Sequence, residues 1–235
     1  MQCHLDPSIT FLGVWDTVGS LGIPGSLLAA SNKEKFAFHD TNPSPLVKRA
    51  VQALAIDEHR RDFTPTFWTG TVPPNVSIEQ VWFAGAHADV GGGYKTRRLA
   101  DIPLVWMAKQ SEAVGLTFDW TCLPDPTALD VTAPTHDSSS GLFALDRYHP
   151  TLREIGMTKC SVKLNESLYE ALDENGKPVS TINERIYKSA ISRYAVPAQV
   201  CSDDANGTCS QAVYEPETMA PFYSSGTFAG LRIVD

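Results

Sequence analysis

The sequence has no apolar run that could cross a membrane. None of its stretches approaches the ~20 consecutive apolar residues that a membrane-spanning helix requires. The N-terminus also lacks the basic segment and the following apolar segment of a secretory signal peptide. We therefore expect cytoplasmic synthesis and, at most, transient contact with a membrane surface.

Positive charge is scarce in this chain. The 19 lysines and arginines stand against 27 aspartates and glutamates, and the formal net charge is −8. Adjacent basic residues form only short, separated pairs, at positions 48–49, 60–61 and 97–98. Because a nucleic-acid-binding protein must neutralise phosphates with clustered basic side chains, nucleic acid is not expected as a partner.

Cysteine patterns typical of metal sites are absent as well. The five cysteines are widely spaced and include no Cys-x-x-Cys pair, so a structural metal site is not predicted. Cys201 and Cys209 bracket a turn-rich loop that a disulfide would close. Two reduced thiols are at least as good an interpretation, and the sequence leaves both open.

The first half of the chain has the pattern of a parallel α/β fold. Residues 9–15 are almost continuously apolar and β-prone, which is typical of a strand buried on both faces of a parallel sheet. A second strand is predicted at residues 81–84. Apolar residues at three- and four-residue intervals predict a sheet-covering helix over residues 45–57, and another helix is predicted from Asp101 to near Gly115. This alternation predicts a mostly parallel sheet with flanking helices.

Beyond residue 120 the patterns weaken and loops predominate. Residues 182–194 are expected to include a short helix, and strands are expected near Val213 and over residues 228–234. No linker divides the chain into two domains. We therefore expect residues 1–195 to form one α/β domain and residues 196–235 to form a loop-rich tail that packs on it.

Two polar residues mark the ends of the predicted strands. Asp16 directly follows the first strand, and His87 follows the second. In open α/β sheets, sites are built at this edge. A Ser-His-acid hydrolase needs an imidazole as general base and a carboxylate that orients it. Asp16 and His87 keep the order of acid then histidine that α/β-hydrolases use.

Other interpretations of these residues stay open. An aspartate after a strand is often a turn residue or a helix cap, and a histidine in a glycine-rich loop often bonds to the backbone. His87 and Asp89 could also be two metal ligands, because an imidazole and a carboxylate two residues apart in a loop can share an ion. The candidates for further ligands are His39-Asp40, His59 and His136-Asp137.

The third member of a serine triad is missing. No Gly-x-Ser-x-Gly sequence occurs, and the serines at positions 20, 26 and 138–140 lack the strand–turn–helix setting of a nucleophile elbow. Cys3 has no preceding strand and is not expected to be a nucleophile. The glycines at 91–93 predict a tight loop, but they lack the patterns of a phosphate-binding or dinucleotide-binding loop.

Three long segments of the chain carry a specific resemblance. They are residues 11–19 (FLGVWDTVG), 53–61 (ALAIDEHRR) and 81–94 (VWFAGAHADVGGGY). In this order they closely resemble the DUF2235 family of α/β-hydrolases, which includes the Tle1-like phospholipase effectors of bacterial type VI secretion. Shorter likenesses at residues 101–107 and 136–138 extend the resemblance over about residues 8–195.

The resemblance implies a partial α/β-hydrolase fold that hydrolyses lipid or other acyl esters without a cofactor. The family's catalytic acid falls on Asp16 and its catalytic base on His87. Its nucleophile elbow, usually Gly-Phe-Ser-Arg-Gly, precedes the Trp-Asp-Thr-Val segment and has no match here. We therefore expect an upstream segment or a second polypeptide to supply the serine, and we expect the chain alone to be inactive.

The missing elbow also leads to an alternative function. A hydrolase sheet without its first strands would expose an unpaired edge and an apolar face. The chain would then be a catalytically inactive remnant that acts as an interaction or assembly module. The resemblance to effectors further implies delivery by a secretion system after cytoplasmic synthesis.

Overall fold

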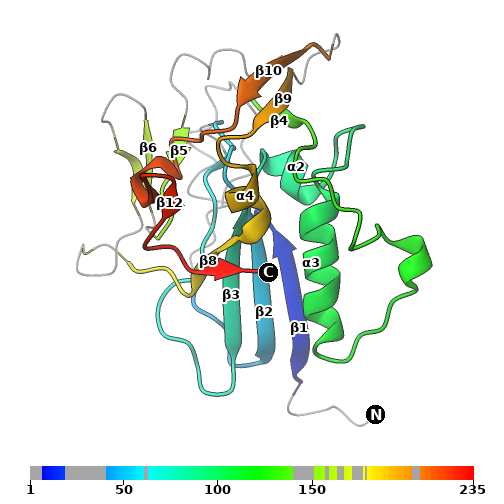
Figure 1. The fold of residues 1–235 in the computed structure, drawn as a ribbon. Coiled ribbons are helices and arrows are strands. Elements are labelled where there is room, and N and C mark those ends of the chain that lie inside the picture. The colour runs from blue at the N-terminus through cyan, green and yellow to red at the C-terminus, as the bar shows by residue number, and fades with distance from the viewer. Residues whose placement is uncertain are drawn as a thin grey trace, which may run out of the picture.

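The structure, a computed structural model, describes residues 7–18, 41–60, 63–139, 151–156, 159–162, 167–170, 177, 179–202 and 207–235. At its centre is a five-stranded sheet in the order β1-β2-β3-β8-β13, in which every neighbouring pair is parallel (Figure 1). The predicted α/β class with a mostly parallel sheet is therefore confirmed. The strands are β1 (Ile9–Trp15), β2 (Val47–Ala55), β3 (Ser77–Phe83), β8 (Glu184–Tyr187) and β13 (Ile233–Val234).

The second strand of the sheet corrects a sequence-based prediction. The helix expected over residues 45–57 is wrong, because β2 occupies this segment. From Ala50 to Ala55 every residue of β2 is buried, since the strand lies between β1 and β3. A strand that is buried on both faces needs no alternation of polar and apolar residues. The three- and four-residue spacing of its apolar residues therefore reflects continuous burial and does not mark a helical face.

The first strand is where it was predicted, but it is less buried than expected. Among the described residues, β1 pairs with β2 alone and lies at one end of the sheet. Ile9 is 48% exposed and Leu12 is 36% exposed. The expectation of burial on both faces is therefore wrong for β1. The strand predicted at residues 81–84 is confirmed as the end of β3.

The longest described helix packs on the sheet, and two short helices follow strands within a few residues along the chain. Helix α3 (Asp101–Glu112) confirms the second predicted helix and packs along β1 and β2 (Figure 1). The short helix expected within residues 182–194 is α4 (Lys188–Arg193), which begins where β8 ends. Helix α2 (His87–Gly91) begins four residues after β3. No helix in the described parts of the chain is long and apolar enough to span a membrane.

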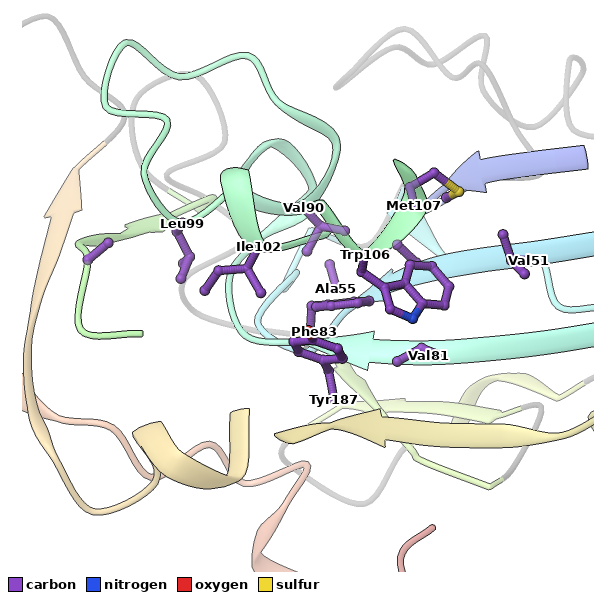
Figure 2. Close-up of a cluster of buried hydrophobic side chains, with 12 residues drawn as sticks. Val51, Ala55, Val81, Phe83, Val90, Leu99, Ile102, Trp106, Met107 and Tyr187 are labelled. Atoms are coloured by element: carbon purple, nitrogen blue, oxygen red, sulfur yellow. The ribbon is translucent and has the colours of Figure 1, made fainter. Parts of the chain in front are cut away.

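Apolar clusters cover both faces of the sheet. On the face that carries α3, the Phe83 ring packs 5.3 Å from Trp106 and 4.8 Å from Tyr187, measured between ring centroids (Figure 2). On the other face, Trp82 packs in a cluster with Ile186. Successive residues of a strand point to opposite faces, so β3 contributes to both clusters.

A second sheet is formed by β4 (Thr135–Asp137), β9 (Pro197–Ser202) and β10 (Cys209–Val213) and lies beyond the carboxyl ends of the central strands (Figure 1). A disulfide between Cys201 and Cys209 joins two of its strands, so of the two alternatives for these cysteines the structure has the bonded one. The strand expected near Val213 is confirmed, whereas within residues 228–234 only Phe228 and residues 233–234 are in strands. The remaining elements are β5 (Thr151–Arg153), β6 (Lys159–Val162), β7 (Ser167–Glu170), β11 (Tyr223–Ser224), β12 (Thr227–Phe228), and the 3-10 helices η2 (Trp120–Cys122) and η4 (Ala220–Phe222).

Candidate active site

The fold brings Asp16 and His87 into direct contact. Asp16 follows β1 and His87 opens α2 after β3, so both lie beyond the carboxyl ends of parallel strands. The Nδ1 atom of His87 lies 2.7 Å from Oδ2 of Asp16. The Asp16 side chain is fully buried, whereas the imidazole is 30% exposed. The two residues form a carboxylate–imidazole pair that is open to solvent on its histidine side.

Positive φ angles mark the turn after each of these strands. Asp16 has a φ of 40°, a conformation that non-glycine residues adopt rarely. Gly85 has a φ of 109°, and a Cβ atom there would lie 2.4 Å from the Cβ of Asp89. Gly92 and Gly93, which follow α2, also have positive φ. The loop predicted at residues 91–93 therefore begins only at Gly92, because Gly91 is the last residue of α2. Glycine at position 85 therefore reflects both backbone conformation and lack of space.

Arg153 is the main partner of the Asp16 carboxylate. Its Nη1 donates to Oδ1 at 2.6 Å and its Nη2 donates to Oδ2 at 3.1 Å, and the amide of Ala55 also donates to Oδ1 at 2.9 Å. Sequence reasoning missed Arg153, since it belongs to no motif and lies 137 residues from Asp16 along the chain.

The electrostatic surroundings keep Asp16 ionised. Burial is the largest influence on its pKa and raises it, but the charge of Arg153 and the hydrogen bonds from His87 and Arg153 together lower the pKa to about 2. An ionised carboxylate can only accept hydrogen bonds, so the 2.7 Å contact requires a proton on Nδ1 of His87. In the neutral imidazole, Nε2 then has the free lone pair of a general base.

The lowered pKa of Asp16 predicts a loss of stability in acid. Because the folded-state pKa of about 2 lies below the ordinary aspartate value of 3.8, the ionised carboxylate stabilises the fold above the unfolded-state pKa. This contribution, about 2 kcal/mol, is lost as the pH falls from about 5 to about 2. Urea unfolding of wild type and Asp16→Asn across this range should show a steeper pH dependence for wild type. Parallel curves for the two proteins would contradict the assignment.

A second carboxylate supports the backbone of the histidine. The His87 amide donates to Oε2 of Glu58 at 3.1 Å, and the Arg60 guanidinium binds both oxygens of Glu58, at 2.9 and 2.8 Å. Burial raises the pKa of Glu58, but the hydrogen bond and charge of Arg60 outweigh this effect and lower it. The Phe63 ring meets the imidazole edge-on at 5.1 Å between centroids. These contacts restrict where the imidazole can lie.

Asp89, the other residue considered for metal binding, has a different partner. Its Oδ1 lies 2.7 Å from Nδ1 of His136, and its Oδ2 accepts from the amides of Ala86 and His136, at 3.0 and 2.9 Å. The Tyr94 ring stacks on His136 at 3.7 Å. Within the described residues, no group of three or more side chains is placed to hold a metal ion. Asp89 thus ties helix α2, which begins at His87, to β4. Residues 39–40, two further ligand candidates, lie outside the described residues.

A cavity of about 400 Å³ is lined by residues next in sequence to the partners of the carboxylate–imidazole pair, although neither Asp16 nor His87 lines it. Asp57 and His59 line it, and Glu58 between them binds the His87 amide. Leu152 also lines the cavity, and the next residue, Arg153, binds Asp16. Apolar residues of β9 and β10 form much of its wall, namely Ala198, Val200, Ala212 and Val213.

The fold and this pair define the structural class of the protein. It has a partial α/β fold in which a carboxylate and an imidazole are in contact at the carboxyl edge of a parallel sheet. Residues 1–110 match the family model described as the T6SS phospholipase effector Tle1-like catalytic domain. The resemblance to Tle1-like effectors is therefore confirmed for this part of the chain, which contains both Asp16 and His87. No curated protein and no solved structure matches the chain. The wider assignment to DUF2235 stays a prediction.

Proposed function

We propose that the chain supplies the acid and the base of a Ser-His-Asp carboxylic-ester hydrolase that acts on lipid acyl esters. One observation carries this proposal: the buried, ionised Asp16 holds Nδ1 of the partly exposed His87 at 2.7 Å. This arrangement leaves Nε2 as the atom that can take a proton. The match of residues 1–110 to a phospholipase effector catalytic domain supports the same reaction class.

The reaction follows the usual order of a serine triad. His87 Nε2 removes the proton of the serine hydroxyl as its oxygen attacks the ester carbonyl, and Asp16 stabilises the imidazolium that results. His87 then returns this proton to the leaving alcohol, and water repeats the sequence to release the acid. No cofactor takes part in this scheme. Since the sequence contains no Gly-x-Ser-x-Gly, the serine comes from an upstream segment or a second polypeptide.

An apolar acyl chain is the substrate group that we propose, in line with the phospholipase effector family that residues 1–110 match. The cavity of about 400 Å³ lies among residues next in sequence to the partners of the pair, and residues of β9 and β10 make part of its wall apolar. Such a cavity can take up part of a hydrocarbon chain, in line with the usual size of ligand sites. We propose that the protein contacts membrane surfaces only transiently and that a secretion system delivers it, as the name of the matching effector family implies.

The C-terminal tail, residues 196–235, is proposed to be part of the same structural unit. We propose that residues 1–195 form the hydrolase part and that residues 196–235 pack on it. The Tyr214 hydroxyl donates to Oδ2 of Asp57 at 2.9 Å, and β13 pairs with β8 in the central sheet. These contacts join the tail to Asp57 and to the central sheet.

The test is ester hydrolysis by the product of the native locus, expressed with its upstream DNA. We expect release of fatty acid from phospholipid vesicles, and a loss of about 10⁴- to 10⁶-fold in His87→Ala, because the base is removed. The 235-residue chain alone should be inactive. Asp119→Asn, a change on the surface, serves as a control that keeps activity. Wild-type rates in His87→Ala would refute the proposal.

An interaction module is the second candidate function, and the exposed side of β1 favours it. Among the described residues, β1 has a strand neighbour on one side only and carries the exposed Ile9 and Leu12. A free parallel edge of this kind can accept a strand from another segment. If the native-locus product binds a partner through this edge and hydrolyses no ester, the interaction module replaces the hydrolase.

A further inference from the structure

A buried guanidinium holds three segments together around the Asp16 carboxylate. Besides its two bonds to Asp16, Arg153 donates from Nη1 to the carbonyl of Ala55 at 2.7 Å and from Nη2 to the carbonyl of Phe63 at 2.6 Å. Its side chain is 1% exposed. The two carbonyls fix the plane of the guanidinium, so its bidentate contact fixes the plane of the carboxylate in turn.

We propose that Arg153 is the positioning residue of the Asp16–His87 pair, and that its guanidinium keeps the carboxylate charged and turned so that one oxygen faces Nδ1 of His87. The inference rests on the proposed function, since the pair is the acid and base of that reaction. It goes further, because it assigns the orientation and charge of the pair to a residue of β5, outside the segment that matches the effector family.

The need for such a residue follows from burial. Asp16 has no exposed surface, and a buried carboxylate without a partner tends to bind a proton and become neutral. His87 alone is a weak compensating partner, because it carries a positive charge only when protonated. Arg153 is charged at every accessible pH, so it keeps Asp16 ionised while the imidazole is neutral and ready to accept a proton.

The same charge opposes proton uptake by the pair. Arg153 offsets part of the carboxylate charge, so a protonated His87 gains less from Asp16 than it would without the guanidinium. Other charged groups around His87 in the described residues include Glu58, which accepts from its amide, and Arg60, which neutralises Glu58. They also include Asp57, which accepts from the Gly85 amide, and Asp89 of the same helix, which pairs with His136. Phe63 contributes an uncharged ring. Arg153 is thus the charge whose removal should change the titration of the pair most.

The test uses NMR on the 235-residue chain and does not depend on hydrolysis. The imidazole resonances of His87, identified by their loss in His87→Ala, are followed from about pH 4 to about pH 9 in wild type, Arg153→Gln and Arg153→Lys. In Arg153→Gln the titration midpoint, the pH at which the Asp16–His87 pair takes up a proton, should rise by about one to two units, whether the proton settles on the carboxylate or on the imidazole, since a cation near the pair is gone. In Arg153→Lys it should stay within about half a pH unit of wild type, because the charge is kept.

The Arg153→Lys variant also tests whether Arg153 orients the Asp16 carboxylate. Lysine cannot bind both carboxylate oxygens with a rigid fork, so the downfield Nδ1 proton resonance of His87 should broaden or move upfield although the charge is kept. A purely structural arginine would lower thermal stability without moving the midpoint. An unchanged midpoint in folded Arg153→Gln overturns the proposal. If that variant does not fold, a wild-type Nδ1 resonance in Arg153→Lys overturns it.

These outcomes separate the inference from the proposed function. If the midpoint moves but the native-locus product hydrolyses no ester, Arg153 keeps its positioning role and the hydrolase assignment fails. If hydrolysis depends on His87 but the midpoint does not move, the hydrolase stands and the role of Arg153 fails.

Discussion

Asp16→Asn is expected to lower ester hydrolysis by the native-locus product about 10⁴-fold. The amide has no charge to stabilise the imidazolium, and its NH2 group cannot accept the Nδ1 proton of His87. Its single oxygen is also the atom that Arg153 would bind most strongly. The imidazole is then free to adopt the tautomer with its proton on Nε2, which cannot act as a base. The measurement is kcat/KM on phospholipid vesicles.

The same variant should also be less stable, and this effect must be separated from catalysis. Removing one partner of a buried ion pair costs about 3–5 kcal/mol, because Arg153 keeps its charge. The assay therefore needs a temperature at which circular dichroism shows a folded variant. Glu184→Gln is the matched control: Glu184 accepts from Trp82 Nε1 at 2.6 Å and from the Gly156 amide at 2.8 Å, and burial raises its pKa. It should hydrolyse within about twofold of wild type, since among the described residues no hydrogen bond links Glu184 to Asp16 or His87. A folded Asp16→Asn protein with wild-type kcat/KM would refute the role of Asp16.

Trp106→Ala is expected to lower the free energy of unfolding by about 3–5 kcal/mol. Trp106 is 2% exposed and packs on Phe83 in the cluster between α3 and the sheet (Figure 2). Its removal leaves a cavity that the neighbouring side chains can fill only in part. A loss of this size is a large share of the total stability of an ordinary domain, about 5–15 kcal/mol.

Urea unfolding measures this loss as a lower midpoint at an unchanged slope. Leu116→Ala is the control, because Leu116 is 54% exposed and its truncation should change stability by less than about 0.5 kcal/mol. Equal midpoints for Trp106→Ala and Leu116→Ala would show that the cluster between α3 and the sheet contributes little to stability.

Sequence patterns located the strands that lead to the candidate site. Residues 9–15 and 81–84 combine apolar, β-prone side chains with an abrupt polar or glycine boundary, and the structure has β1 and the end of β3 there. The same approach failed for β2. Its apolar spacing also fits a helix, and only the two flanking strands reveal that both of its faces are buried.

The sequence by itself determined a parallel α/β fold, and it placed Asp16 and His87 after two of the strands, because side-chain patterning within a segment reports how that segment is buried. Only the tertiary structure decided that these two side chains touch, that Arg153 holds the carboxylate, and that Asp89 pairs with His136. These contacts join residues 47 to 137 positions apart. No local pattern specifies such pairs, because they depend on how the strands and loops are packed together.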